Sequence, residues 1–179
     1  MKNAKVTLVP LTADDREPFI LDNQWAFKFG ATEEFGMLDN HLEEDGEIIS
    51  RGTIEQSIDS ADSEAYRIVY EGKKVGGAVL RIDDTTHHNH LDLLFISPVM
   101  HGKGIGYGAW QAIEALHPET EVWETCTPYF EKRNIHFYIN KCGFHAVEFF
   151  GAFHPDPDEP ADRNSEGPDE MFQFEKVMK

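Results

Sequence analysis

The stretch HGKGIGYGAW, residues 101–110, contains four glycines and leads directly into a sequence with the periodicity of a helix. The first turn of a helix presents N–H groups without intrahelical partners, together with the positive end of the helix dipole. Gly102, Gly104 and Gly106 would let an anion such as a phosphate reach that backbone directly. A turn this rich in glycine can also serve only to pack a strand against a helix. The stretch therefore predicts a strand-to-helix turn, with phosphate binding as the functional interpretation and tight packing as the alternative.

The segments on either side of this turn complete a strand–turn–helix–strand unit. HLDLLFI, residues 90–96, is a nearly continuous apolar run, typical of a strand covered on both faces, and a proline two residues later ends it. Residues 105–116 carry apolar side chains at helical spacing, and EVWETCT, residues 121–127, predicts the next strand. Such a unit normally closes right-handed and brings its turn to the carboxyl edge of the sheet, where ligands collect.

The rest of the chain adds further strands and helices around this unit. Before it, the pattern predicts a strand at residues 4–11, helices at 12–29 (with Thr12 as N-cap) and 53–60, and a hairpin over 65–84 that turns at 71–73. After it, the pattern predicts a helix over 129–144, closed by Gly143, and strands at 145–153 and 171–178, with loops at 30–52 and 154–170. The order is βααβββαβαββ. Because no linker or repeat divides the chain, we expect a single domain over residues 1–179.

The charge of the chain limits the partners that it can attract. The chain contains 33 acidic residues but only 16 lysines and arginines, and its formal net charge is −17. This field repels phosphate backbones and anionic lipid, so we expect no nucleic-acid or membrane binding, whereas a cationic molecule would be attracted. No signal peptide or long apolar window is found, which predicts a cytoplasmic protein, and Cys126 and Cys142 are expected to be reduced core thiols.

Two familiar nucleotide motifs are missing from the glycine stretch. The pattern G-x-x-x-x-G-K-[ST] is absent, and G-x-G-x-x-G fails because position 107 is tyrosine. The HHNH run, residues 87–90, invites a zinc interpretation, but a strand places neighbouring histidines on opposite faces and no further ligands stand nearby. We therefore expect no metal site.

Two stretches together carry a resemblance to a known family. LLFISPVMHGKGIGYGAWQAIEAL, residues 93–116, resembles the acyl-CoA-binding motif of the Gcn5-related N-acetyltransferase (GNAT) superfamily, in which Gln or Arg, two residues, Gly, one residue, and Gly or Ala form the pyrophosphate loop. His101, Gly104 and Gly106 take those places, and His101 departs from the usual Gln or Arg. RNIHFYINKCGF, residues 133–144, resembles the later motif of the same family.

The resemblance implies an α/β (α+β) fold with a mixed, mostly antiparallel, strongly twisted sheet, splayed central strands and helices on both faces. It also implies transfer of an acetyl group from acetyl-CoA directly to a primary amine. Backbone N–H groups near Phe95 and Ile96 would stabilise the oxyanion. The other cofactor-binding candidates, carried over by position, are His101, Gly102, Lys103, Gly104, Ile105, Gly106 and Asn134.

The resemblance also assigns catalytic candidates. Tyr138 matches the tyrosine that protonates the departing thiolate, although it could also simply pack its helix against the sheet. Asp92 is the first candidate for the base that deprotonates the amine and His90 is the second, because a period of two places His90, Asp92, Leu94 and Ile96 on one face of their strand. Both could instead be exposed residues at the start of the strand.

Several alternatives stay open at this point. The acidic segments at residues 33–47 and 156–170 would flank the acceptor side and favour a small cationic amine or a basic peptide as acceptor, but they could also be solvated loops. A non-catalytic acyl-CoA-binding sensor or interaction domain is the second interpretation of the chain, supported by His101, and a nucleotide-binding protein is the third. Dimers are common in the resembled family, so a homodimer is also expected by analogy.

Overall fold

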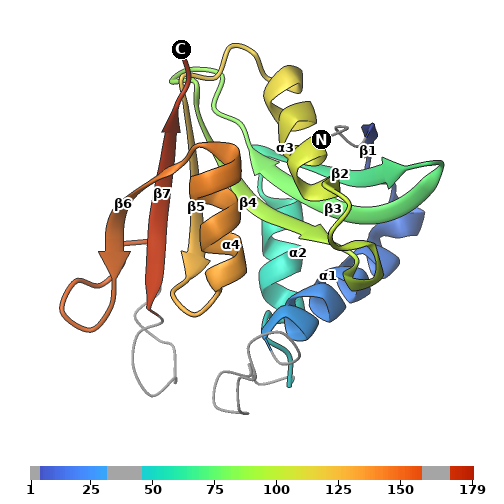
Figure 1. The fold of residues 1–179 in the computed structure, drawn as a ribbon, viewed down its shortest axis with the longest axis horizontal. Coiled ribbons are helices and arrows are strands. Elements are labelled where there is room, and N and C mark those ends of the chain that lie inside the picture. The colour runs from blue at the N-terminus through green and yellow to red at the C-terminus, as the bar shows by residue number, and fades with distance from the viewer. Residues whose placement is uncertain (1–4, 32–45, 159–169) are drawn as a thin grey trace.

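The chain folds around one mixed sheet (Figure 1). The computed structural model describes residues 5–31, 46–158 and 170–179. Within them the strand order is β1-β2-β3-β4-β5-β7-β6, and only β4 and β5 pair in parallel. The seven strands are β1 (Val6–Pro10), β2 (Ser63–Tyr70), β3 (Lys73–Arg81), β4 (His88–Ile96), β5 (Val122–Pro128), β6 (His145–Phe150) and β7 (Met171–Val177).

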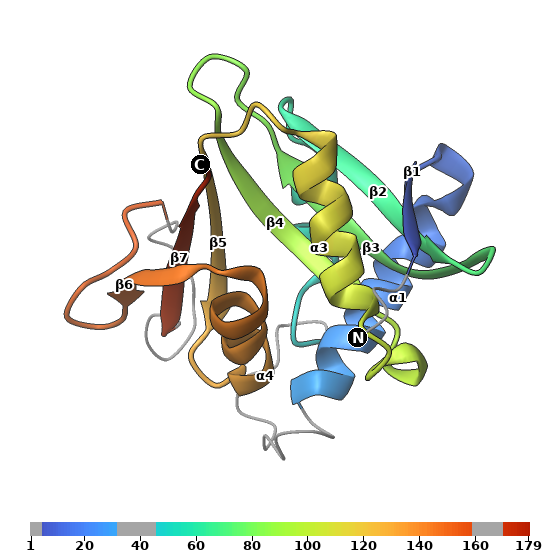
Figure 2. The same ribbon diagram turned by 45° about the horizontal axis from the view of Figure 1, so that its top comes forward.

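Helices cover both faces of the sheet. Figures 1 and 2 show α3 and α4 on one face and α1 and α2 on the other. Their bounds are α1 (Arg16–Phe29), α2 (Arg51–Asp59), α3 (Ile105–Leu116) and α4 (Lys132–His136), which continues as the π-helical segment η5 (Phe137–Cys142); short 3-10 segments precede α1 (η1, Ala13–Asp15) and α3 (η4, Pro98–Met100). The predicted order of elements and the mixed, mostly antiparallel sheet are confirmed.

Some predicted helix boundaries were wrong for identifiable reasons. Thr12 makes no side-chain cap, and a 3-10 turn separates it from α1. Helix α2 begins two residues before the predicted start because the Ser50 side chain accepts a hydrogen bond from the Thr53 N–H. Helix α4 begins at Lys132 because Tyr129 donates its N–H to Glu170 instead of entering the helix. Gly143 ends the helical segment in the left-handed conformation (φ 83°), as predicted.

The two parallel strands separate soon after they meet. Their pairing covers three residue pairs and ends at His90 with Glu124, although β4 continues to Ile96 and β5 to Pro128. The ribbons of β4 and β5 diverge beyond this point (Figure 2). The splayed central strands that the resemblance implied are therefore present.

A β-bulge at Asp92 divides β4 into two halves. Val79 pairs with Leu93 and Leu80 pairs with Leu91, so Asp92 has no partner residue on β3. The extra residue shifts the alternation of side chains by one position, so side chains on either side of the bulge that would share a face of the sheet lie on opposite faces. Leu91 therefore packs in the cluster of Trp110 on the α3 side, whereas Leu93 packs against α1.

Two glycines on β3 let aromatic side chains pack directly against the sheet. A Cβ at Gly77 would lie 2.3 Å from the Phe19 ring and 2.7 Å from the Phe95 ring, and a Cβ at Gly76 would lie 2.1 Å from the Phe95 carbonyl oxygen. Phe19 of α1 and Phe95 of β4 meet edge to face over this position, with ring centroids 5.2 Å apart. Glycine is thus required here to bring α1 close to β4.

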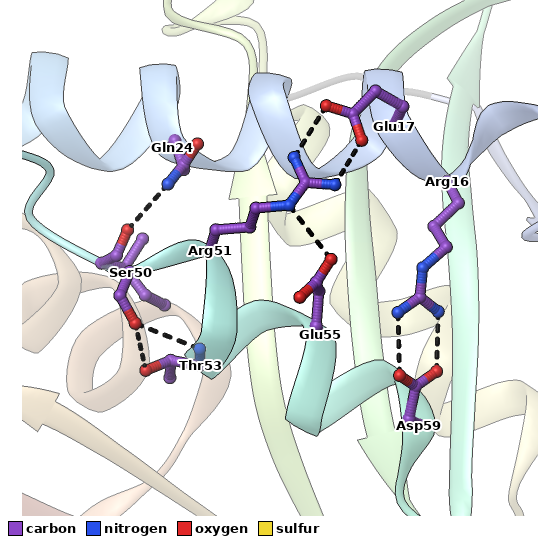
Figure 3. Close-up of polar contacts among 9 residues, drawn as sticks. Arg16, Glu17, Gln24, Ser50, Arg51, Thr53, Glu55 and Asp59 are labelled. Atoms are coloured by element: carbon purple, nitrogen blue, oxygen red, sulfur yellow. Dashed lines mark hydrogen bonds and ion pairs between the residues drawn. The ribbon is translucent and has the colours of Figure 1, made fainter. Parts of the chain in front are cut away.

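Exposed ion pairs hold α2 alongside α1 (Figure 3). Arg16 makes a two-pronged pair with Asp59, and Arg51 makes one with Glu17 and a further contact with Glu55. Each exposed pair contributes only about 0.2–1 kcal/mol, so their main effect is to fix the orientation of the two helices.

Candidate active site

A cavity opens beside the diverging strands. Its volume is about 570 Å³, within the range of small-ligand sites. Its walls come from the end of β4, the loop and first turn of α3, the α4–η5 segment and the carboxyl end of α1. The lining includes nine of the predicted site residues: Phe95, Ile96, His101, Gly102, Gly104, Ile105, Gly106, Asn134 and Tyr138.

Three predicted residues lie outside this lining. Lys103 belongs to the glycine loop but is exposed and does not contribute to the cavity wall. His90 and Asp92 lie at the point where β4 and β5 separate, before the strand reaches the cavity at Leu94. The cavity residues that the sequence reasoning missed include Leu94, Glu131, Arg133 and Lys141.

The glycine loop has the geometry that an anion site needs. Gly102 (φ 80°) and Gly104 (φ 72°) have left-handed backbones, and a Cβ on either would point into open space. The first hydrogen bond of α3 runs from the Gly108 N–H to the Gly104 carbonyl, so the N–H groups of residues 105–107 have no acceptor within the helix. These N–H groups and the helix dipole fit a phosphate group at this end of the cavity.

The opposite wall presents backbone amides from β4. The Ser97 N–H bonds to Val75 of the β3 side, and alternate residues of a strand point their N–H groups the same way. The Phe95 amide therefore belongs to the β3 ladder, whereas the Leu94 and Ile96 amides turn toward the side from which β5 has departed. Amides near Phe95 and Ile96 were predicted to stabilise the oxyanion. The alternation along β4 instead makes Leu94 and Ile96 the amides on the cavity side, and the Phe95 amide points away from the cavity.

Tyr138 lines the cavity from the π-helical segment. Its side chain is 6% exposed and packs with Phe144 and Phe174. Burial raises its pKa, so the phenol is neutral near pH 7, and its hydroxyl is hydrogen-bonded to that of Thr125. Thr125 in turn donates to the Leu91 carbonyl oxygen at 2.9 Å. Tyr138 is therefore both a core residue and a protonated group that lines the cavity.

His101 joins the end of β4 to α4. Its Nε2 lies 3.0 Å from the Ile96 carbonyl oxygen, and its Nδ1 lies 2.7 Å from Nη1 of Arg133. The ring also meets Phe29 of α1 edge to face. Arg133 is the first residue of the second motif, one position before the predicted cofactor contact Asn134. This position in the sequence was a signal that a basic side chain lies near the glycine loop.

Asp92 is the centre of a polar cluster on the α2 side of the sheet. It accepts hydrogen bonds from Ser57 of α2 (2.7 Å) and Arg81 of β3 (3.0 Å), and its Oδ1 lies 2.8 Å from His90 Nδ1. Burial disfavours the ionised carboxyl, but the nearby His90 ring, the hydrogen bond from Ser57 and the charge of Arg81 outweigh it, so the pKa of Asp92 is lowered.

The expected common face of His90, Asp92, Leu94 and Ile96 was wrong. Asp92 points toward Ser57 of α2, whereas Leu94 and Ile96 pack in the clusters of the α3 side. The cause is the bulge at Asp92, which shifts the alternation by one residue.

Three further points of the sequence concern metal ligands, membrane helices and the acidic segments. Within residues 5–31, 46–158 and 170–179, no group of three or more His, Cys, Asp or Glu side chains could hold a metal ion. In the same part of the chain, no helix has the length and apolar character that crossing a membrane requires. Most of the two acidic segments, at residues 33–45 and 159–169, lies outside the described residues.

Comparisons with known proteins agree with this architecture. Residues 13–144 match the model of the Acetyltransferase (GNAT) family. An uncharacterised protein of Bacillus subtilis (strain 168), YrkN, is 45% identical over 180 residues, which cover 98% of this chain and 95% of YrkN.

Solved acetyltransferase structures share the fold at low sequence identity. The ribosomal-protein-S18-alanine N-acetyltransferase of Escherichia coli superposes with a TM-score of 0.68 at 12% identity, covering 98% of this chain and 95% of that one. The spermidine N-acetyltransferase of Vibrio cholerae, solved with CoA and spermine, gives 0.66 at 14% identity over 96% and 95%. A GNAT acetyltransferase of Elizabethkingia anophelis with acetyl-CoA bound gives 0.64 at 16% identity over 99% and 100%. With a family model that matches most of its length and a fold shared with these enzymes, the chain belongs to the GNAT acetyltransferase family.

Proposed function

We propose that the protein is an N-acetyltransferase that moves an acetyl group from acetyl-CoA directly to a primary amine. The observation that carries the proposal is one cavity whose wall includes both the backbone of the glycine loop and the neutral phenol of Tyr138. An elongated donor with phosphates at one end and a thioester at the other matches this arrangement.

The chain offers a group for each stage of the transfer. Attack of an amine on a thioester carbonyl places negative charge on the carbonyl oxygen, and the Leu94 and Ile96 amides can donate to it from the open side of β4. The leaving thiolate then needs a proton. Tyr138 can supply it because its phenol is protonated at neutral pH.

The amine must also lose a proton, and His90 suits this role better than Asp92. The carboxylate of Asp92 already accepts hydrogen bonds from Ser57 and Arg81 and lies 2.8 Å from His90 Nδ1, and its lowered pKa makes it a weak base. The same carboxylate lies 2.8 Å from Nδ1 of His90, and we assign proton acceptance to the other ring nitrogen, Nε2. We therefore assign proton removal to His90, with Asp92 as the residue that positions it.

A cationic amine is the acceptor class that the charge of the chain favours. The net charge of −17 attracts cations, and Glu124 lies opposite Glu175 in the β5–β7 ladder, one strand away from His90. Two structural neighbours are named ribosomal-protein-S18-alanine N-acetyltransferase and spermidine N-acetyltransferase, and both names describe acetylation of an amine. The acceptor is thus a polyamine, a related small amine or a peptide N-terminus.

Binding and turnover of acetyl-CoA test the proposal. Calorimetry should show that acetyl-CoA binds, whereas ATP and NAD do not, and free thiol should be released when polyamines or peptides are added. Gly104→Glu serves as the binding control, because a side chain at this left-handed position (φ 72°) would occupy the phosphate end. Binding without thiol release across the amine panel would favour a non-catalytic acyl-CoA sensor, and absence of binding would overturn both interpretations.

A further inference from the structure

We propose that Arg133 of α4 holds the phosphate groups of the donor, and that His101 is the residue that positions it. This inference rests on the proposed function, since it assumes a donor with phosphates at the glycine loop. It assigns the cationic contact to a residue of α4, 32 positions away from His101 in the chain.

The hydrogen bonds of His101 determine where the positive charge lies. A guanidinium has only donors, so the contact between Arg133 Nη1 and His101 Nδ1 requires that Nδ1 accept. The proton of the neutral ring is then on Nε2, which donates to the Ile96 carbonyl oxygen. In this arrangement His101 accepts at Nδ1 and donates at Nε2, and Arg133 supplies a positive charge beside the loop.

The same contacts fix the position of the guanidinium. Ile96 is the last residue of β4, and Arg133 lies in α4, so the His101 ring connects the two sides of the cavity. Both His101 and Arg133 line the cavity together with Gly102 and Gly104. The guanidinium is therefore held next to the backbone N–H groups at the start of α3, and one of its N–H groups donates to the ring.

Electrostatics explain why such a cation is needed. The chain carries a net charge of −17 and the cavity wall includes Glu131, so a donor with several phosphates enters an unfavourable field. The α3 dipole supplies only about half a positive charge. A guanidinium supplies a full charge that persists at every physiological pH, in a planar geometry that matches two phosphate oxygens.

Affinity measurements on the full chain test this assignment. We expect Arg133→Ala to weaken acetyl-CoA binding about 10- to 100-fold, the range for loss of one or two charge-assisted hydrogen bonds, and to reduce the dependence of the affinity on salt. S-acetylpantetheine carries no phosphate, so its kcat/KM should be unchanged by the same substitution. Lys73→Ala removes an exposed positive charge at the start of β3 and should leave both donors unaffected.

A double variant separates charge from structure. His101→Arg combined with Arg133→Ala places a guanidinium at the first position of the loop, and we expect it to recover most of the acetyl-CoA affinity. Equal acetyl-CoA affinity in Arg133→Ala and the unsubstituted protein would overturn the inference while leaving the proposed function intact. Equal losses for acetyl-CoA and S-acetylpantetheine would also overturn it, because they would indicate a structural role. If the unsubstituted protein does not bind acetyl-CoA at all, the proposed function fails and the inference with it.

Discussion

His90 Nδ1 lies 2.8 Å from Oδ1 of Asp92, at the last residue pair before β4 and β5 separate. Asp92 is the bulged residue of β4, and the bulge turns its carboxylate toward α2 and into contact with Ser57. The bulge therefore turns Leu94 and Ile96 toward the α3 side of the sheet. It also keeps the Asp92 carboxylate beside the His90 imidazole, where β4 and β5 separate.

Substitution of this pair should separate the base from the residue that positions it. We expect His90→Gln to lower kcat/KM at neutral pH by about 100-fold or more, in the range for loss of a general base, with little change in acetyl-CoA affinity. Rates measured with a saturating donor give the answer; an unchanged kcat/KM in His90→Gln would remove His90 from the mechanism.

Asp92→Asn should lower the rate of acetyl transfer less than His90→Gln does. The amide keeps the shape of the side chain but cannot hold the His90 ring and Arg81 by charge, so we expect kcat to fall while the donor affinity stays the same. Ser57→Ala removes only one hydrogen bond to Asp92 and is the matched control. Activity in Asp92→Asn equal to that of Ser57→Ala would show that the carboxylate does not act through His90.

Tyr138→Phe tests the proton donor to the leaving thiolate. Loss of the hydroxyl removes the proton source but keeps the ring that packs with Phe144 and Phe174. We expect kcat to fall about 10- to 1,000-fold, with an unchanged dissociation constant for acetyl-CoA. Thr125→Val, which removes the hydroxyl partner of Tyr138, should have a smaller effect on kcat. Equal turnover of Tyr138→Phe and the unsubstituted enzyme would leave Tyr138 as a packing residue.

Local signals in the sequence were sufficient to predict the order of the elements, whereas the mixed sheet and its splayed central strands were implied by the family resemblance. The apolar run of β4, the glycine loop and the periodicity of α3 each depend on neighbouring residues, and the bounds of α3 were predicted correctly at both ends. The direction of side chains on β4 could not be predicted, because the bulge at Asp92 depends on how β3 pairs with it. The contact between His101 and Arg133 likewise joins two segments that only the tertiary structure brings together.

The buried ion pair of Asp15 and Arg67 should make stability depend on pH. Burial raises the pKa of Asp15, but hydrogen bonds from Arg67 and Lys74 outweigh it, so the pKa lies below its usual value. A lowered carboxyl pKa stabilises the folded state above the unfolded pKa of about 3.9, and this contribution is lost as the pH falls through the lower native value.

Asp15→Asn should therefore destabilise the protein by about 3 kcal/mol at pH 7, since it leaves the Arg67 guanidinium buried without its main partner. Urea unfolding at several pH values measures this difference, which should shrink as the pH falls below about 4. Asp59→Asn, which breaks an exposed pair, should cost less than about 1 kcal/mol. A difference between Asp15→Asn and the unsubstituted protein that stays constant down to acid pH would show that ionised Asp15 is not the stabilising group.

Gly77 should tolerate no side chain. An added Cβ would overlap the rings of Phe19 and Phe95, so we expect Gly77→Ala to cost about 1–3 kcal/mol of unfolding free energy. Gly52 provides a matched control within α2, where a Cβ meets only the Ser50 hydroxyl at 3.9 Å and alanine should stabilise the helix by about 0.5–1 kcal/mol. Urea midpoints of the two variants should thus move in opposite directions, and an unchanged midpoint for Gly77→Ala would show that α1 can shift away from β3 without loss.

The two cysteines should be unreactive in the native protein. Burial, followed by the nearby carboxylates of Asp156, Glu124 and Asp92, raises the pKa of Cys126 to about 12, and burial raises that of Cys142 to about 12. At pH 8 only about one thiol in 10,000 is then ionised, and the thiolate is the reactive form. Ellman's reagent should therefore label neither cysteine within minutes in the native state and both after unfolding in guanidinium. Rapid labelling of Cys126→Ser would assign a reactive thiol to Cys142, and rapid labelling of Cys142→Ser would assign it to Cys126; either result would contradict the burial of that side chain.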